Sequence, residues 1–202
     1  MVMGAVTMLA VGLTPESAFV SAPRSVIVAI DSLTRLDMID YYNSGSTVAS
    51  RNSLGGESSV TELSKDAITV ATSRSSQVTI ALLPSGKRDT VLMVINTLAL
   101  PVADSFIEMY DRNWNRLSSS KYEIPSHNNL KMWLQPQSKG VTTDIENHVP
   151  FISALYTYSD CVLRVTNTLS RLLPREEYDE IKDYLKSEIC YRWTGGKWTR
   201  VK

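Results

Sequence analysis

Three side chains that could bind a metal ion alternate along residues 144–148. Asp144, Glu146 and His148 are each separated by one residue, so on an extended chain they would share one face. Two carboxylates and an imidazole can bind a divalent cation or supply the acid and base of a hydrolytic enzyme. The alternative is a solvated loop before a strand near Phe151, and we favour it because the chain has no second group of such ligands.

A serine and a lysine at the spacing used by penicillin-recognising enzymes occur at Ser118 and Lys121. Those enzymes also need Ser-Asp-Asn and Lys-Thr-Gly motifs, and the chain contains neither. The G-x-S-x-G motif of serine hydrolases is missing as well. The sequence therefore does not support serine chemistry, and we assign no catalytic residue.

The end of the chain carries the clearest candidate for ligand binding. Gly195-Gly196 has the composition of a two-residue hairpin turn. This turn would place Trp193 directly opposite Trp198 as a close, non-hydrogen-bonded pair, with Tyr191 and Arg200 on the same face. Such a row of aromatic rings and a guanidinium group could stack against sugar rings, or it could form part of the core beneath a helix. Both interpretations remain open, and the core is the commoner one.

Length and charge limit the classes of partner. The 202 residues suit one domain, and 21 Lys and Arg against 21 Asp and Glu give a formal net charge of zero. Basic residues never form a run longer than two, so we exclude nucleic acid and expect an unidentified protein or carbohydrate partner. Neither G-x-G-x-x-G nor a P-loop is present, so we expect no cofactor.

The first thirteen residues are uncharged and mostly apolar. As a helix, Met1–Leu13 would span about 20 Å, short of the roughly 30 Å of a bilayer core, so no membrane span is predicted. The segment matches the apolar region of a secretory signal with small residues at 10–12, but its basic start is missing because the first basic residue is Arg24. A buried N-terminal helix is the alternative. We favour a signal-peptide remnant at 1–13, and a domain at 14–202 that is exported to the periplasm or secreted.

The two cysteines, Cys161 and Cys190, allow two outcomes. An exported protein can form a disulfide, but a domain of this length does not need one, and buried free cysteines are common. The sequence leaves the pairing open. Two cysteines and two distant histidines do not have the spacing of a zinc site.

Hydrophobic patterns predict an α+β fold with a large antiparallel sheet built from hairpins. Short helices are expected at 14–22, with Thr14 as the cap, and at 34–44, with a capping box from Thr34 to Asp37 and with Leu36 and Ile39 at helical spacing. One C-terminal helix is expected to begin at Pro174, before the final hairpin, with Lys186 toward its end. Alternating or continuous apolar runs predict strands at 68–71, 78–82, 90–98, 104–110, 151–158 and 161–169, with Ser159-Asp160 as the turn between the last two. Residues 118–129 and 135–147 are predicted to be exposed loops.

Several short motifs in order along the chain resemble the domain-of-unknown-function family 3256. These motifs are Arg35–Tyr41, Asn52-x-Leu54-Gly55-Gly56, Ala103-Asp104-Ser105, Leu173-Pro174-x-Glu176-Glu177-Tyr178 and Tyr191-x-Trp193. The resemblance covers about residue 16 to the end. It implies a small exported protein of Bacteroidales bacteria with an N-terminal signal peptide. The family has no assigned activity, so the resemblance implies no catalytic residue.

These observations favour a non-catalytic binding or interaction module of the cell envelope. Its main support at this level is the set of nine Tyr and four Trp beside only three Phe, because rings with a polar edge suit surfaces that meet water. A metal-dependent or hydrolytic enzyme and a structural or assembly factor are the alternatives.

Overall fold

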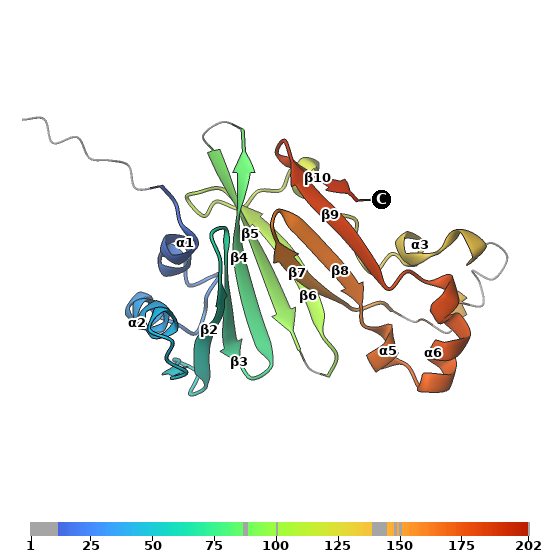
Figure 1. The fold of residues 1–202 in the computed structure, drawn as a ribbon, viewed down its shortest axis with the longest axis horizontal. Helices are drawn as coiled ribbons and strands as arrows, with labels where there is room; N and C mark the ends of the chain where they lie inside the picture. Colours follow the sequence, from blue (N-terminus) through green and yellow to red (C-terminus); the bar gives the residue numbers. More distant parts are fainter. Residues whose placement is uncertain are drawn as a thin grey trace, which may run out of the picture.

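The computed structural model describes residues 12–86, 89–99, 101–138, 145–147, 149 and 151–201. Within these ranges the chain forms two antiparallel sheets with short helices at both ends (Figure 1). The α+β prediction is confirmed, and the strands expected from the sequence are divided between the two sheets. No helix in the described ranges is long and apolar enough to cross a membrane.

The first sheet has six strands in sequence order, and the second has four in the order β10-β9-β8-β7. The six strands are β1 (Ser50–Arg51), β2 (Glu57–Leu63), β3 (Ala67–Ser73), β4 (Ser76–Ser85), β5 (Asp89–Leu98) and β6 (Asp104–Tyr110). The four strands are β7 (Ala154–Ser159), β8 (Val162–Asn167), β9 (Glu188–Thr194) and β10 (Lys197–Arg200). The helices are α1 (Pro15–Ser21), α2 (Ser32–Asn43), η1 (Ser120–Tyr122), α3 (Leu130–Trp133), η2 (Pro136–Ser138), α5 (Leu169–Leu172), α6 (Arg175–Ile181) and η3 (Lys182–Tyr184).

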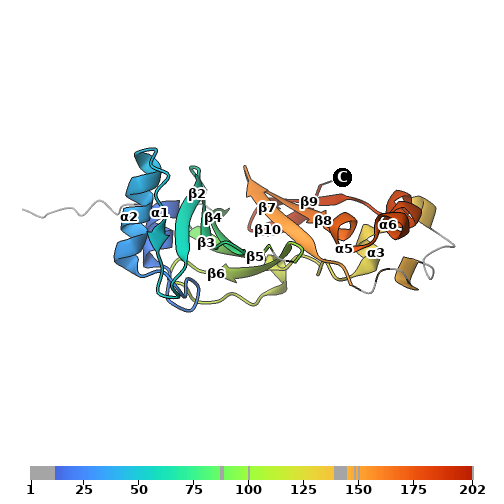
Figure 2. The same ribbon diagram turned by 90° about the horizontal axis from the view of Figure 1, so that it is seen from below.

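The six-stranded sheet is covered on both faces. Helices α1 and α2 lie on one face, and the four-stranded sheet lies on the other (Figure 2). This double cover explains why the middle of β5 is a continuous apolar run, with residues 91–95 all buried. The four-stranded sheet buries one face only. Its strands β7 and β9 therefore alternate between buried and more exposed positions, as expected for a sheet with one solvated face.

Side chains, rather than a backbone ladder, join β6 to β7. The Asp104 Oδ1 atom accepts a hydrogen bond from the backbone N–H of Ala154, and the Ser105 hydroxyl accepts one from the backbone N–H of Tyr156, each at 3.1 Å. At another point of the interface, the Trp193 indole donates to the Pro84 carbonyl at 2.7 Å. The two sheets therefore pack as separate layers, and side-chain hydrogen bonds between them fix their relative position.

The N-terminal helices follow the predicted caps only in part. Helix α1 begins as predicted, with Thr14 as cap and Pro15 in its first turn. Helix α2 begins at Ser32, two residues before the predicted start, because the Asp31 carboxylate accepts hydrogen bonds from the backbone N–H groups of Leu33 and Thr34, each at 3.0 Å. The predicted capping box that starts at Thr34 is therefore wrong.

The buried face of α2 contains a charged side chain. Arg35 is only 2% exposed, whereas Leu36, the next residue, is 47% exposed. The Arg35 guanidinium donates hydrogen bonds to backbone carbonyls of residues 19, 20, 22, 27 and 30. It also lies 5.7 Å from the centroid of the Phe19 ring. Arg35 thus ties α2 to the whole segment that precedes it.

The C-terminal elements match the sequence with two corrections. Helix α6 follows Pro174 but ends at Ile181, so Lys186 lies beyond it rather than in its last turn. The turn between β7 and β8 is formed by Asp160 and Cys161, both with positive φ angles (48° and 60°), instead of Ser159-Asp160. Positive φ at both central residues is the geometry of the tight turns that connect antiparallel strands.

Candidate functional site: a cleft beside the edge of β6

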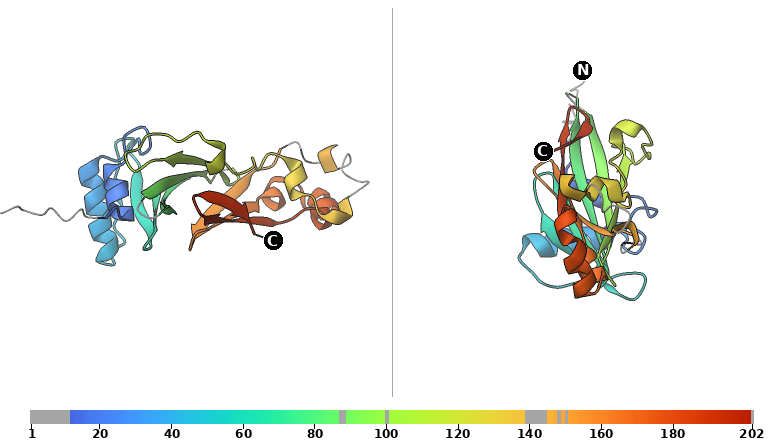
Figure 3. Two further views of the ribbon diagram at one scale, coloured as in Figure 1. Left: turned by 90° about the horizontal axis from the view of Figure 1, so that it is seen from above. Right: turned by 90° about the vertical axis from the view of Figure 1, so that its right-hand side faces the viewer.

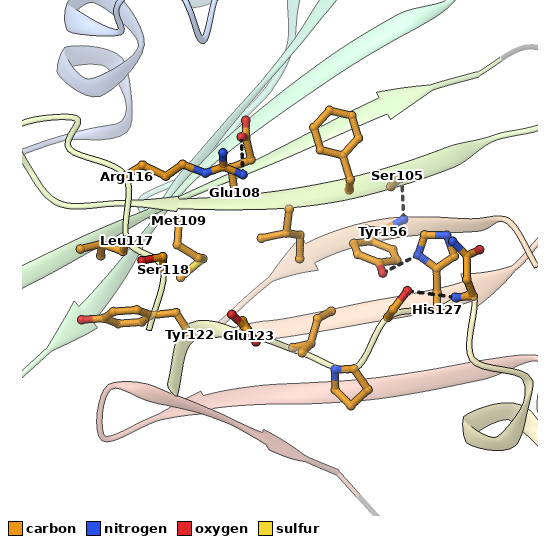
Figure 4. A pocket seen from close by; sticks show the side chains of 16 residues that line it. Ser105, Glu108, Met109, Arg116, Leu117, Ser118, Tyr122, Glu123, His127 and Tyr156 are labelled. Carbon is orange, nitrogen blue, oxygen red and sulfur yellow. Dashed lines mark hydrogen bonds and ion pairs between the residues drawn. The ribbon is translucent and has the colours of Figure 1, made fainter. Parts of the chain in front are cut away.

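A cleft of about 560 Å³ lies between β6 and the segment that follows it (Figure 4). We call it the β6 cleft. One wall is formed by Ser105–Met109, and the other by Arg116–Ser118 and Tyr122–Asn128; Tyr156 from β7 lies at the His127 end. The lining is mixed, with carboxylate, guanidinium, hydroxyl and imidazole groups beside apolar side chains.

A tight reversal after β6 sets the position of the second wall. The Asp111 carboxylate accepts hydrogen bonds from the backbone N–H groups of Asn113 and Asn115, at 2.8 and 2.9 Å. The chain then pairs with β6 for a short distance, where the N–H of Leu117 donates to the Met109 carbonyl at 2.8 Å. After Leu117 it leaves β6 on its way to α3 (Figure 3). The cleft occupies the space that this divergence opens.

A buried histidine closes one end of the cleft. His127 Nδ1 lies 2.8 Å from the Tyr156 hydroxyl, and Nε2 lies 3.0 Å from Asp104 Oδ1, although not aligned for a hydrogen bond. Burial lowers the pKa of His127, and the nearby Asp104 carboxylate opposes part of this effect. A neutral ring with its proton on Nε2 fits both neighbours, because Nδ1 then accepts the hydrogen bond from Tyr156.

The surroundings of His127 hold it in place. Its backbone carbonyl accepts a 2.8 Å hydrogen bond from the indole of Trp133, a side chain with no exposed surface. On the opposite wall, the Ser105 hydroxyl lies 2.8 Å from the Thr97 hydroxyl of β5. Burial is the main cause that raises the pKa of Tyr156, so its hydroxyl stays protonated and can serve as a donor. This end of the cleft is therefore rigid.

The cleft also contains an ion pair and an exposed aromatic ring. Glu108 and Arg116 are 3.1 Å apart, and the Tyr110 hydroxyl donates to Glu108 at 3.2 Å. Phe106, two residues before Glu108 on β6, also lines the cleft and is 53% exposed. The cleft thus offers hydrogen-bonding groups and apolar surface along one strand.

The sequence profile of a family described as "Protein of unknown function (DUF3256)" matches residues 10–198. The chain belongs to this family. A domain of an uncharacterized protein from Porphyromonas gingivalis W83 has a similar structure, with a TM-score of 0.77 and 22% sequence identity over 95% of this chain and 99% of that one. That likeness confirms the fold alone. No functionally curated protein matches the sequence significantly.

In this DUF3256 chain the predicted aromatic row lies in the core. Trp193 faces Trp198 as predicted, with ring centroids 5.1 Å apart at 70°. Tyr191 and Trp193 are only 4% and 3% exposed, so their rings are not open to a ligand. Arg200 lies opposite Tyr191 and donates to the Met132 carbonyl at 3.4 Å.

The buried aromatic row nevertheless supports the cleft. The Trp193 ring stacks on Tyr122, which lines the β6 cleft, with centroids 6.3 Å apart and planes 12° from parallel. The hairpin of β9 and β10 therefore fixes a ring of the cleft wall from behind.

The predicted metal trio falls largely outside the described residues. Asp144 and His148 are not among them, and Glu146 is exposed in a helical turn at 145–147. Among the described residues, no group of three or more His, Cys, Asp or Glu side chains is placed to hold a metal ion. Ser118 lines the β6 cleft, and Lys121 lies with its Nζ atom 4.5 Å from the centroid of the Tyr122 ring.

The two cysteines cannot pair within one chain. Both are free. Cys161 lies opposite Trp193, because the N–H of Trp193 donates to the Cys161 carbonyl at 2.9 Å. Cys190 is three residues farther along β9, which corresponds to about 10 Å along a strand, whereas a disulfide needs Cα atoms within about 7 Å.

Sequence reasoning missed Asp104, His127 and Tyr156 as a group. They come from a strand end, a stretch predicted to be an exposed loop, and a strand on the other sheet. The available signals were that His127 is one of two histidines in the chain and that Asp104 lies in a motif shared with the family. Spacing along the sequence does not reveal a cluster that forms only when β6 and β7 meet.

Proposed function

We propose that this DUF3256 chain is an exported, non-catalytic binding module of the cell envelope that holds its ligand in the β6 cleft. The observation that carries the proposal is the cleft itself, which has a rigid polar end at His127 and apolar surface along β6. Binding sites commonly combine mostly preformed walls with a few placed polar groups.

The environment of His127 favours binding over catalysis. A general base needs a nitrogen that can reach a proton of the substrate. Here one ring nitrogen is bonded to the Tyr156 hydroxyl and the other lies beside Asp104, so both are directed at protein groups. The three side chains act as a brace between β6, β7 and the cleft wall.

Export is supported by the uncharged apolar segment Met1–Leu13, which has the length of a signal-peptide core. The family match begins at residue 10, so residues 1–9 of this segment lie outside it. N-terminal sequencing of the mature protein from its bacterial host is expected to find a start between Leu13 and Ala18. A mature protein that still begins at Met1 and stays in the cytoplasm would contradict this part of the proposal.

Obstruction of the cleft tests the proposal that the ligand binds there. Candidate ligands are found by selecting peptides from a displayed library of random nonapeptides on the folded chain. An array of bacterial oligosaccharides is screened against the same folded chain. Ser118→Trp places a large ring in the cleft lining and is expected to weaken binding of the selected ligands at least tenfold, measured by calorimetry. Thr157→Trp is the control, because Thr157 is exposed on the solvated face of the four-stranded sheet.

The binding measurements show whether the selected ligands bind in the β6 cleft or elsewhere on the protein. If Ser118→Trp binds the selected ligands as tightly as the parent chain, the cleft is not the binding site. Equal losses in both variants would point to a general effect of the added tryptophan, and would also contradict the proposal.

A further inference from the structure

The outer edge of β6 has a defined hydrogen-bonding direction. In an antiparallel ladder, the N–H and C=O groups of one residue point to the same side, and those of the next residue point to the other side. The Met109 carbonyl points away from β5, because it accepts the hydrogen bond from Leu117. The backbone groups of Ser105 and Ile107 must therefore point the same way, into the β6 cleft.

The backbone of this edge is only partly covered. Leu117 covers one end through its bond to Met109, and the Asp104 and Ser105 side chains meet β7 at the other. Between them, no described residue donates to or accepts from the outward N–H and C=O of Ile107, and none accepts from the N–H of Met109. An open strand edge is a template for another strand, so folds usually protect it.

The side chains around this edge suit a strand better than a sugar. A strand laid along β6 would direct alternate side chains to opposite faces. One set would meet exposed Phe106 and the Glu108–Arg116 ion pair, and the other would meet partly buried apolar residues such as Ile107 and Ile124. A carbohydrate has no repeat of donors and acceptors that matches the spacing of a strand edge.

We propose that the ligand of the β6 cleft is an extended polypeptide segment that adds as a strand to the edge of β6, with its backbone bonded to Ile107. This inference rests on the proposed function, and it names the class of ligand. The edge from Ser105 to Met109 is about 14 Å long, and its unpaired groups lie at Ile107 and Met109, so about three residues of the partner would pair. Main-chain hydrogen bonds would provide affinity, and the alternating side-chain sites would provide selectivity.

Backbone methylation of the peptide tests the pairing directly. The probes are synthetic copies of nonapeptides selected on the full chain from a displayed random library. Within the paired residues, methylation of single backbone nitrogens is expected to weaken binding at least tenfold where the N–H points at β6 and by less than twofold at the positions between. A paired strand directs only alternate N–H groups at its neighbour, which produces this period of two.

Substitution at Ile107 tests the same bond from the protein side. Ile107→Pro removes the outward N–H and is tolerated on an edge strand, because β5 does not use that group. We expect at least a tenfold loss of peptide binding for Ile107→Pro and less than a twofold change for Ile107→Val, which keeps the N–H. Thermal unfolding of both variants checks the fold; if Ile107→Pro does not fold, the methylation series decides alone.

The results distinguish this inference from the proposed function. Peptides that lose binding in Ser118→Trp but show no alternation on methylation would overturn strand addition and leave the cleft as the binding site. The same conclusion holds if only oligosaccharides bind in the cleft. If no ligand of either kind depends on Ser118, both proposals are wrong.

Discussion

Replacement of Arg35 by alanine is expected to lower the free energy of unfolding by about 3–5 kcal/mol. Arg35 is 2% exposed, and its guanidinium donates to backbone carbonyls of five residues between Phe19 and Ile30. Its partners are carbonyl oxygens rather than a carboxylate, so the charge is solvated by the backbone. Without the guanidinium, these buried acceptors lose their donor, and the segment between α1 and α2 loses its anchor. Urea denaturation followed by circular dichroism measures the effect.

Two further variants separate this role from a general effect of charge. Arg35→Lys keeps the charge, but a single ammonium group cannot reach carbonyls spread around a planar guanidinium, so we expect a loss of about 2–3 kcal/mol. Arg24→Ala removes an exposed arginine from the same segment and is expected to change stability by less than about 0.5 kcal/mol. Equal stability of the Arg35→Ala and Arg24→Ala variants would show that the buried network contributes nothing.

Arg35 also shows where hydrophobic patterning fails. Leu36 and Ile39 fall at helical spacing, and apolar residues at this spacing normally mark the inner face of a helix. Ile39 is buried, but the helix is rotated so that Arg35 and Met38 face the core beside it and Leu36 is exposed. The rotation is possible because the irregular segment 22–30 supplies carbonyl acceptors that no helix or strand uses. No pattern in α2 itself indicates those acceptors.

Local geometry, by contrast, could be predicted in detail. The glycine pair after Thr194 fixed the register of β9 and β10, and therefore the contact between Trp193 and Trp198. The predicted range 104–110 for β6 is the observed one. Whether the aromatic row faces solvent or the core could not be derived, because it depends on the six-stranded sheet that covers it. The division into two sheets is likewise tertiary, since β6 and β7 meet through the side chains of Asp104 and Ser105.

The second large effect is expected at Trp193, which links the two sheets. Its ring is 3% exposed, stacks on Tyr122 and contacts Trp198, and its indole donates to the Pro84 carbonyl on β4. Trp193→Ala is expected to cost about 3–5 kcal/mol, since it leaves a cavity in the core between the sheets and frees a buried carbonyl. Urea denaturation again measures the loss. Peptide binding should weaken too, because Tyr122 loses the ring that supports it from behind.

The neighbouring tryptophan provides a matched control with a much smaller expected effect. The Trp198 Nε1 atom is buried and has no hydrogen-bond partner among the described residues, whereas Trp193 Nε1 has one at 2.7 Å. Trp193→Phe removes a satisfied donor and is expected to cost about 1–3 kcal/mol. Trp198→Phe removes an unsatisfied donor, which offsets the loss of ring area, so a change within about 1 kcal/mol of zero is expected. If both phenylalanine variants lose the same stability, the indole bond to Pro84 is not what holds the two sheets together, and ring volume alone accounts for the cost.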